Sequence, residues 1–587
     1  MATFSSRYIF FSTSPRNPRL IQGILKVILD GGLDGKEYTK ALQAQFYNLY
    51  SESDVGVKGA NSSKSPDLSG RDKLTRAPQS LGFLQTQNRK PLQVTAAGKQ
   101  LLNNDLFEDV LMHQMLKFQL PSPLHHETAQ NKGRFYIKPF LEILRLINTL
   151  QYLTYDELTI FGMSMTDYRN FQVTVDAIRQ YRRDRESTRG KKSLKKLSDD
   201  TKYAHYRAIY ADMITAGNIA TRESKTTSES QFMKKKLANL SDYTDAVFRI
   251  LRQSGLIVMS AGRTLSISPV RQREVSYILT QIERKPMPED MDRSQFDKYM
   301  FNPDLPILLN DNRASLQSDI VSLKPSTSID RDLDGMNTYE LKSVLAKLRR
   351  RQREDRVTAQ AKRLKERRDE DIQNILDVFK HISDKEVGRD GPLMLEWNMW
   401  RAITMIDHGD IKGNFVTDDN GMPISTAGGG QGDIVGNYGD FQMIVEVTLS
   451  TGKRQYDMES EPVTRHVGEV QSKSDKPVFG MFVAQNLTPT VVNYFWTTNL
   501  LNHKVYNGSV DIIPMNLATF VAFFKAASHK VLDASDLLSI HQYSTKIARK
   551  TALAGQTEDD WHRKVLDYVQ EVVCVESVKI CHDSSQC

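Results

Sequence analysis

Two acidic residues stand where a short strand and the loop before it could bring their carboxylates together. Residues 441–449 are mostly apolar or β-branched, which predicts a strand with Glu446 and Thr448 on one face. Asp433 lies upstream, and the polar segment 436–440 between them suits a hairpin turn. A chain that folds back there would bring Asp433 close to Glu446. Two such carboxylates form a pocket of hard oxygen ligands, which favours Mg²⁺.

This arrangement resembles the PD-(D/E)-x-K nuclease pattern, in which an aspartate, a strand glutamate and a backbone carbonyl hold the metal. The resemblance implies that Asp433, Glu446 and the carbonyl of Val447 are the ligands. Gly432 stands where the pattern has proline, and Thr448 stands where it has lysine. The cation that would activate water is therefore unassigned. The alternative is a loop aspartate and an edge-strand glutamate without a metal.

The residues after this strand carry a more specific resemblance. Glu-Val-Thr at 446–448 is followed by Ser450, Gly452 and the segment Met-Glu-Ser-Glu-Pro-Val-Thr-Arg-His at 458–466. This sequence resembles the cleavage domain of the AlwI family of type IIS restriction endonucleases, which includes site-specific nicking endonucleases. The resemblance extends to residues 12–18, 119–122 and 396–397. It implies an enzyme that binds a short asymmetric sequence in double-stranded DNA and hydrolyses phosphodiester bonds a few base pairs to one side.

Further candidate catalytic residues follow and precede the strand. Pro462 is expected to open a helix, with Glu459 in the turn before it and His466 in its early turns. Glu459 could join the metal directly or through water, and His466 could orient or deprotonate the water. The resemblance favours these roles over a structural histidine, and it implies an accessory metal role for Glu396. Lys453 is a second candidate for the missing lysine.

Charge is concentrated in two segments of this basic chain, whose formal net charge is +8 over 587 residues. Residues 182–196 hold eight basic and two acidic residues, and residues 342–368 hold twelve basic and three acidic residues. Such patches could neutralise DNA phosphates, although each could instead be a solvated helix face. The candidate DNA-binding residues are Arg89, Lys90, Arg182, Arg183, Lys191, Lys192, Lys195 and Lys196.

The chain is expected to be a multidomain α+β protein. Residues 1–284 would form a mainly helical DNA-recognition region, because residues 70–105 and 240–282 both have the helix, strand, turn, strand and helix order of a winged helix. Such units also bind proteins. Residues 285–385 would form a largely helical, basic linker, whose part 285–335 reads as a connection rather than a core. The long charged run 338–383 lacks a sustained heptad, which argues against a coiled coil.

Residues 386–587 alternate between helical and buried-strand patterns, which predicts an α/β nuclease domain with a PD-(D/E)xK-like sheet covered on both faces. The glycine-rich residues 428–432 precede Asp433 and lack a following Gly-Lys-Ser/Thr, so no nucleotide cofactor is expected. His125 and His126 lack metal-binding spacing and are expected to be loop residues. The tyrosines near residue 206 are expected to be structural.

Other functions remain open at this point. The chain could nick one strand, or be the large subunit of a heterodimeric enzyme, because one active site cuts one strand. Cutting both strands would require a second nuclease subunit or a transient homodimer. A different class is a winged-helix DNA-binding regulator with a silent nuclease-like domain. The three cysteines lack zinc spacing and no apolar run could span a membrane, so a cytoplasmic, bacterial protein is expected.

Overall fold

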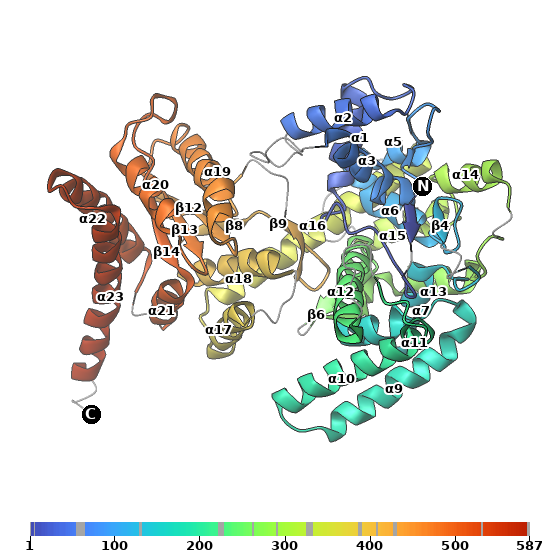
Figure 1. Cartoon of the computed structure of the whole chain (residues 1–587). Coiled ribbons are helices and arrows are strands. Elements are labelled where there is room, and N and C mark those ends of the chain that lie inside the picture. Colours follow the sequence, from blue (N-terminus) through green and yellow to red (C-terminus); the bar gives the residue numbers. More distant parts are fainter. Residues whose placement is uncertain are drawn as a thin grey trace. The chain divides into compact units, whose positions relative to one another are not determined.

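The computed structural model divides the chain into two compact units (Figure 1). Unit 1 comprises Met1–Arg353 and Asp418–Met422, and unit 2 comprises Glu354–Thr417 and Pro423–Cys587. The domain boundaries expected at residues 284 and 385 stay predictions. The structure describes residues 2–4, 6–53, 65–127, 132–220, 228–260, 263–288, 291–323, 333–384, 390–406, 409–426, 431–529 and 532–583.

The first part of unit 1 consists of helices followed by a hairpin. Its elements are α1 (Leu20–Asp30), α2 (Lys40–Glu52), α3 (Pro66–Thr75), α4 (Ala77–Ser80), β2 (Leu84–Gln85), β3 (Gln93–Val94) and α5 (Ala96–Leu101). Strands β2 and β3 are antiparallel, and an isolated bridge joins Glu37 to Pro91 beside them. The predicted element order over residues 70–105 is confirmed, although each strand has only two residues and the helix is interrupted at Arg76.

The second part of unit 1 repeats this order with longer elements. They are α7 (Pro139–Leu150), β5 (Leu153–Thr154), α12 (Glu229–Gln253), β6 (Ile257–Ser260), β7 (Thr264–Ile267) and α13 (Gln272–Gln281). The three strands form one antiparallel sheet in the order β5-β7-β6. The predicted helix, strand, strand and helix over residues 240–282 are confirmed, and residues 261–262 of the predicted turn lie outside the described residues.

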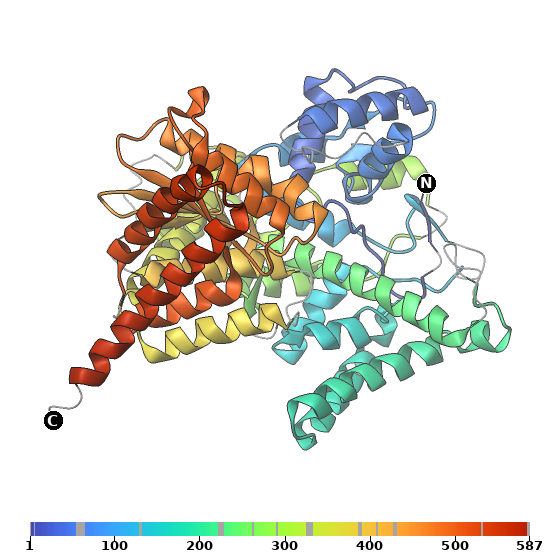
Figure 2. The same ribbon diagram turned by 60° about the vertical axis from the view of Figure 1, so that its left-hand side comes forward.

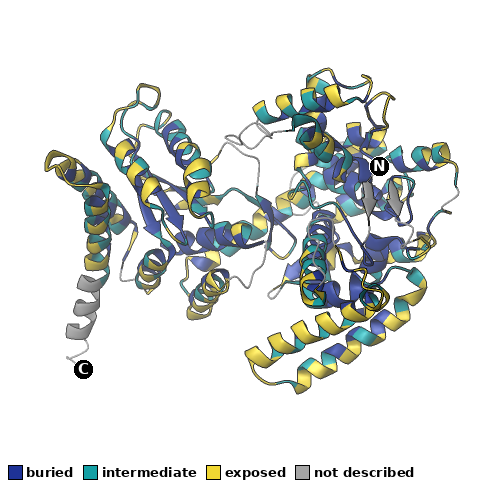
Figure 3. Cartoon of the chain, viewed as in Figure 1, coloured by how far each residue is buried: buried dark blue, intermediate teal, exposed yellow. Residues whose placement is uncertain are grey.

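A pair of long helices is inserted between β5 and α12. Helices α9 (Phe171–Ser187) and α10 (Lys191–Ile209) lie side by side (Figures 1 and 2), and much of their surface is exposed (Figure 3). Tyr206 and Tyr210 are completely buried, and the Tyr206 hydroxyl donates to the carbonyl of Thr159 over 2.7 Å. These two tyrosines are structural, as predicted. Tyr203 is 39% exposed, so this expectation is wrong for that residue.

Residues 285–335 contribute to the core of unit 1, which corrects the expectation of a connection without a core. They contain α14 (Arg293–Phe301) and α15 (Arg313–Leu323). Leu316 and Ile320 of α15 are buried against α16 (Thr338–Leu364), in the cluster Leu316, Ile320, Leu341, Val344, Leu345 and Leu348. The proline- and aspartate-rich composition concealed helices whose few apolar residues are widely spaced. The charged run 338–383 is two helices, α16 and α17 (Asp369–Ser383).

Unit 2 is built on a five-stranded sheet in the order β14-β13-β12-β11-β8. Its strands are β8 (Asp410–Gly413), β11 (Ile434–Asn437), β12 (Gln442–Thr448), β13 (Val478–Ala484) and β14 (Ile512–Asn516). Strand β11 pairs antiparallel with both β8 and β12. Strand β13 pairs parallel with both β12 and β14. Parallel strands are usually covered on both faces. The fully buried residues of β13 fit this rule (Figure 3).

Helices cover the sheet of unit 2 (Figure 1). On the face that includes Ile444, α19 (Lys453–Gln471) and α20 (Pro489–Leu500) contribute Val463, Val467 and Phe495 to one buried cluster. Unit 2 also contains the end of α16, α17, α18 (Gly391–Met405), α21 (Leu517–Ser528), α22 (Ala534–Leu553) and α23 (Glu558–Asp583). The predicted alternation of helix and strand is confirmed. Within the described residues, no helix combines the length and apolar character needed to cross a membrane.

Candidate active site

The hairpin formed by β11 and β12 brings Asp433 to Glu446, as the sequence predicts. Ile434 pairs with Val445 across the antiparallel strands. Asp433, just before β11, therefore lies beside Glu446, just after Val445. The Val447 N–H donates to Asp433 Oδ2 over 2.9 Å, which fixes the direction of this carboxylate. The turn residue Gly439 has a φ of +88°, a conformation that favours glycine. The hairpin therefore sets the two acidic side chains side by side.

Helix α19 places Glu459 and His466 on the same face of the sheet as Glu446. His466 Nδ1 lies 2.7 Å from Glu446 Oε1, and the Thr448 hydroxyl donates to Glu459 Oε1 over 2.7 Å. The alternation predicted for Glu446 and Thr448 is confirmed, because both meet side chains of α19. Glu459 lies inside this helix rather than in a turn before it.

The prediction that Pro462 opens the helix is wrong. Helix α19 begins at Lys453, nine residues earlier, and Pro462 lies in its interior. A proline there has no N–H to donate to the carbonyl four residues before it, which usually disfavours an interior position. Val463 and Val467 are buried against the sheet. We infer that this tertiary packing stabilises the helix despite the lost hydrogen bond.

Four carboxylates contribute to one negative region at this site. Burial, and next the Glu459 carboxylate, raise the pKa of Glu446 to about 8. Burial, and next the Glu446 charge, raise the pKa of Asp433 well above its usual range. Burial, with the charges of Asp433 and Glu459, also raises the pKa of Glu396 on α18. Burial raises the pKa of Glu459, although hydrogen bonds from Thr448 and Ser450 oppose that effect.

Gly432, which departs from the proline of the nuclease pattern, leaves room for this arrangement. A Cβ atom at position 432 would lie 2.5 Å from Ile444 Cγ2 and 3.2 Å from Glu446 Oε1. The first distance is too short for two carbon atoms, so a larger residue would displace the strand that carries Glu446. The departure is therefore part of the local packing and does not disrupt the pair of carboxylates.

The carboxylates of Asp433 and Glu446 offer the hard oxygen ligands that Mg²⁺ prefers. In the described part of the chain, no three His, Cys, Asp or Glu side chains are placed to enclose an ion. Mg²⁺ usually binds one or two carboxylates and keeps several waters. Among the described residues, no lysine or arginine forms an ion pair with Glu396, Asp433 or Glu446. Neighbouring carboxylates that, among the described residues, have no lysine or arginine partner fit a site for a divalent cation.

Two features of the site were missed by the sequence reasoning. Thr448, noted only as a missing lysine, holds Glu459 through its hydroxyl and accepts a hydrogen bond from the Ser450 N–H over 3.0 Å. Arg454, exposed in the first turn of α19, acts electrostatically on Glu459 and opposes the rise that burial causes in its pKa. Lys453 is also exposed in that turn. A search for basic residues within ten positions of Glu446 would have included Arg454.

Comparison with known protein families shows to which family the chain belongs. The sequence profile of the AlwI restriction endonuclease family matches residues 79–523, which include all five acidic and histidine side chains of the site. The chain belongs to the AlwI restriction endonuclease family. The predicted family is therefore confirmed, and with it a restriction enzyme that acts on DNA.

Other comparisons add little to the AlwI assignment. No curated protein matches the chain. Among solved structures, the small subunit of the heterodimeric restriction endonuclease R.BspD6I is 22% identical, with a TM-score of 0.27, and the match covers 33% of this chain and 98% of that one. The binding domain of the BpuJ1 endonuclease, solved with modified DNA, is 13% identical, with a TM-score of 0.29, and covers 49% and 89% of the two chains.

The candidate DNA contacts of this AlwI family member differ in their surroundings. Arg89 and Lys90 are exposed in the turn between β2 and β3, and Arg183 is exposed on α9. The four lysines of α10, Lys191, Lys192, Lys195 and Lys196, are also exposed. In contrast, Arg182 pairs with Glu157 at 2.8 Å and lies 3.8 Å from the centre of the Tyr152 ring. Its guanidinium is therefore held by unit 1 itself.

The second basic segment, on α16, is largely paired with carboxylates. Lys342 pairs with Asp109 and Asp311, Arg349 with Glu274 and Arg353 with Glu108. The expectation of a phosphate-binding patch at residues 342–368 is wrong for these three side chains. They lie along the side of α16 that packs within unit 1, where internal carboxylates neutralise them.

Proposed function

We propose that this protein is a type IIS restriction endonuclease. Unit 1 binds a short asymmetric sequence in double-stranded DNA, and unit 2 hydrolyses phosphodiester bonds a few base pairs to one side with Mg²⁺. The observation that carries the proposal is the negative site made by Glu396, Asp433, Glu446 and Glu459. Buried groups whose pKa values are strongly perturbed are concentrated at functional sites.

The folds of the two units support this division of labour. The sheet of unit 2, with acidic residues on β12, before β11 and on α18, is compatible with a PD-(D/E)xK-like nuclease core. The two helix-and-hairpin parts of unit 1 are compatible with winged-helix units, which commonly bind DNA. Between α1 and α2 the chain also runs beside β3, since the Leu92 N–H donates to the carbonyl of Lys36 over 2.7 Å. The isolated bridge between Glu37 and Pro91 places this segment where a winged helix would have its first strand.

Each acidic residue has a proposed role. Asp433, Glu446 and the carbonyl of Val447 would hold Mg²⁺, and Glu396 and Glu459 would contribute through water. When bound, Mg²⁺ would neutralise the scissile phosphate, lower the pKa of the attacking water and stabilise the leaving 3′ oxygen. Thr448 keeps Glu459 at the edge of the site through the 2.7 Å hydrogen bond.

His466 is the proposed proton acceptor. Its Nδ1 faces Glu446 Oε1 at 2.7 Å, so the proton on Nδ1 would point to that carboxylate. The acceptor nitrogen of the neutral ring is then Nε2, which can take a proton from the attacking water. This arrangement gives the chain a base at a site that lacks the lysine of the nuclease pattern. Arg454 supplies positive charge on the same helix.

Mapping both DNA ends tests the proposal. A plasmid library containing random sequence would be incubated with the protein and Mg²⁺, and the ends of both strands would be sequenced over a range of enzyme concentrations. We expect cuts at one fixed distance from one short asymmetric sequence. Cuts inside a symmetric sequence, or at random positions, would contradict type IIS cleavage.

The same experiment separates the other functions. A cut in only one strand at every concentration would identify a nicking enzyme or the large subunit of a two-subunit enzyme. A second-strand cut that grows with concentration would indicate transient dimerisation. Specific binding without any cut would favour a regulator with a silent domain, for which the replacement of lysine by Thr448 is the supporting observation.

A further inference from the structure

Gln455 is a buried polar residue in the first turn of α19, the helix that also carries Glu459. It is completely buried, and its side-chain amide makes four hydrogen bonds. Its Nε2 donates to the carbonyls of Ser450 over 3.0 Å and Asn486 over 2.8 Å. Its Oε1 accepts from the N–H and the hydroxyl of Thr488 over 2.9 and 3.0 Å. Because carbonyls only accept and an N–H only donates, these partners fix which way round the amide lies.

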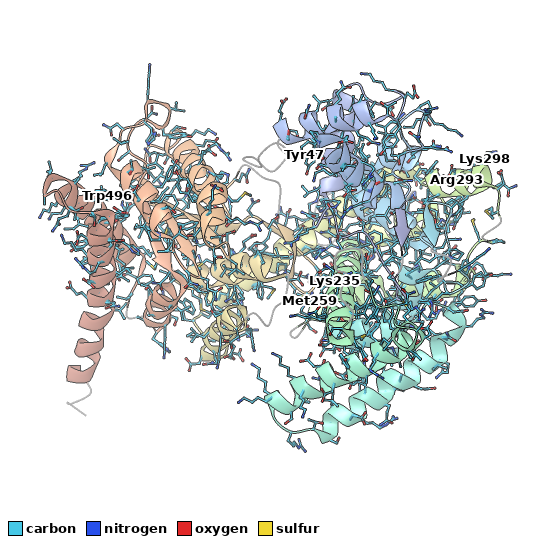
Figure 4. The ribbon with its side chains drawn as sticks, in the orientation of Figure 1. Tyr47, Lys235, Met259, Arg293, Lys298 and Trp496 are labelled. Atoms are coloured by element: carbon cyan, nitrogen blue, oxygen red, sulfur yellow. The ribbon has the colours of Figure 1, made fainter. Side chains whose placement is uncertain are left out.

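The partners of Gln455 lie beyond the carboxyl ends of two neighbouring strands. Strands β12 and β13 pair in parallel, so their carboxyl ends meet at one edge of the sheet. Ser450 lies in the loop after β12. Thr488 lies in the loop after β13 and directly precedes α20, the helix that carries Trp496 (labelled in Figure 4). In open α/β sheets, ligands bind outside the carboxyl ends of the strands. Gln455 therefore ties together two loops at the edge of the sheet where a ligand is expected.

Ser450 connects Gln455 to the acidic site. The Ser450 N–H donates to Thr448 Oγ1 over 3.0 Å, and the Thr448 hydroxyl donates to Glu459 Oε1 over 2.7 Å. The Ser450 side chain also forms a hydrogen bond with Glu459. A hydroxyl has a single proton. Since Thr448 Oγ1 accepts from the Ser450 N–H, its own proton is left for Glu459. We call Gln455, Ser450 and Thr448 the Glu459 support.

We propose that Gln455 is a positioning residue, which holds Glu459 in place for metal binding through Ser450 and Thr448. The inference rests on the proposed Mg²⁺-dependent function of this site. Thr448 stands where the nuclease pattern has lysine, and the Glu459 support gives this threonine a defined task, which is to direct a hydroxyl to Glu459. The amide of Gln455 has no spare hydrogen-bonding group, so a movement of either loop costs one of its bonds. Buried polar networks that are fully satisfied are rigid.

Gln471 provides a matched control on the same helix. Its Nε2 donates to the carbonyls of Tyr506 and Ser509, both over 3.0 Å, at the other end of α19. Methionine keeps the length of a glutamine side chain and removes its hydrogen bonds. Gln455→Met and Gln471→Met therefore each remove a bridge between α19 and nearby backbone, but only the first bridge reaches Glu459.

Gln455→Met should weaken the response to Mg²⁺. In single-turnover reactions we expect the rate to fall about tenfold, which is the effect of losing one hydrogen bond to a charged group. The Mg²⁺ concentration that gives half the maximal rate should rise, whereas DNA affinity without Mg²⁺ should not change. Gln471→Met should match the wild-type protein in all three measurements. Equal rates and equal Mg²⁺ requirements in the two variants would overturn the inference.

Binding of Mg²⁺ without DNA gives a second measurement that does not depend on cleavage. The rise in unfolding temperature would be followed as Mg²⁺ is added to each protein alone. A bound ion stabilises the folded state, so a weaker site needs more Mg²⁺ for the same rise. Gln455→Met should need more Mg²⁺ than Gln471→Met, and identical titration curves would contradict the positioning role.

Thr448 variants test whether Gln455 acts through the Glu459 support. Thr448→Ser keeps the hydroxyl, whereas Thr448→Val keeps the shape without it. We expect Thr448→Ser to retain most of the cleavage rate and Thr448→Val to lose it. Adding Gln455→Met to Thr448→Val should cause little further loss, because the support is already broken. A full additional loss in the double variant would show that Gln455 acts by another route and would overturn the inference.

Hydrogen exchange tests the Glu459 support in the wild-type protein, where no substitution can disturb folding. The amides of Ser450 and Thr488 donate to the side chains of Thr448 and Gln455, so they should exchange slowly although neither residue lies in a helix or strand. Rapid exchange of both amides would overturn the inference. A wild-type protein that does not cut DNA, or that cuts equally well without a divalent cation, would overturn the proposed function instead.

Discussion

Buried carboxylates occur in both units, but their surroundings are opposite. In unit 1, Glu108 pairs with Arg353, and Glu274 pairs with Arg271 and Arg349. In unit 2, Asp433, Glu446 and Glu396 lie near one another and near Glu459, and among the described residues none of the first three pairs with a lysine or arginine, although Glu446 contacts His466. Glu274 and Glu446 are similarly buried, with side chains 6% and 8% exposed, whereas the Glu108 side chain is 24% exposed.

The two groups of carboxylates differ in the direction in which their pKa values are shifted. The charge of Arg353 outweighs burial and lowers the pKa of Glu108 to about 2, and Arg271 and Arg349 lower the pKa of Glu274 in the same way. Burial and neighbouring charges raise the pKa of Glu446 to about 8. In unit 1, opposite charges favour the ionised form of each carboxylate, whereas in unit 2 neighbouring like charges and burial disfavour it. A protein retains such repulsion where a cation is needed for function.

Glu446→Gln should give the largest effect. We expect single-turnover cleavage to fall on the order of 10³-fold, as when a principal electrostatic group is removed from an active site. Thermal stability without Mg²⁺ should stay equal or rise, because burial and the neighbouring Glu459 charge disfavour the ionised form of Glu446. Cleavage would be followed by gel and unfolding by calorimetry. A variant that cuts normally would remove Glu446 from the site.

Glu108→Gln should have the opposite effect on stability. Removing one partner of a buried ion pair leaves Arg353 without part of its counter-charge, so the protein should lose about 3 kcal/mol of stability at neutral pH. Thermal unfolding measured from pH 7 down to pH 2 would check this. The folded pKa of Glu108 lies below its unfolded value of 4.5, so its contribution is complete above pH 4.5 and disappears as the pH falls toward 2.

The wild-type protein and Glu108→Gln should therefore converge in stability in acid. Equal stability of the two proteins at pH 7 would contradict the pairing described for unit 1. Cleavage by Glu108→Gln, measured well below its unfolding temperature, should retain its dependence on Mg²⁺.

His466→Asn should reduce cleavage on the order of 10²-fold, since a positioned base commonly contributes that much or more. The matched control is His541→Asn. His541 Nε2 lies 3.4 Å from Asp511 Oδ2, so it is another histidine beside a carboxylate, but one outside the acidic site. Single-turnover rates at equal DNA occupancy would be compared. Equal losses in the two variants would assign His466 a structural role.

Lys195→Gln combined with Lys196→Gln should give the smallest effect. If both lysines contact phosphates, the slope of log affinity against log salt concentration should decrease by about 0.9 for each lost contact. Arg350→Gln is the control on α16, because Arg350 pairs with Asp105 at 2.8 Å. Binding measured by fluorescence anisotropy at several salt concentrations would show the difference. An unchanged slope in the lysine variant would exclude Lys195 and Lys196 as phosphate contacts.

The part of the site that the sequence predicts depends on local pattern. The apolar run 441–449, the turn before it and the period of two were enough to place Asp433 beside Glu446 and to put Thr448 on the same face. The alternation of helix and strand after residue 386 likewise predicted the α/β sheet. These features follow from neighbouring residues, so one sequence contains the needed information.

The errors concern interactions between residues that are far apart in the chain. The basic residues of α16 looked like a phosphate surface because their partners, such as Glu108 and Glu274, are separated from them by 75 or more residues. Pro462 suggested a helix start, but the packing of Val463 and Val467 on the sheet decides where α19 runs. Charge and proline are weak guides where tertiary contacts set the outcome.

Cleavage by Asp433→Asn at matched DNA occupancy is the most direct test of the proposed Mg²⁺-dependent cleavage site. The wild-type protein and the variant would be bound to the same DNA containing the recognised sequence, and Mg²⁺ would then be added to start a single turnover. We predict that both bind equally well, that the wild-type protein cuts only after Mg²⁺ is added, and that the variant is slower on the order of 10³-fold. Wild-type cleavage without a divalent cation, or unimpaired cleavage by the variant, would contradict it.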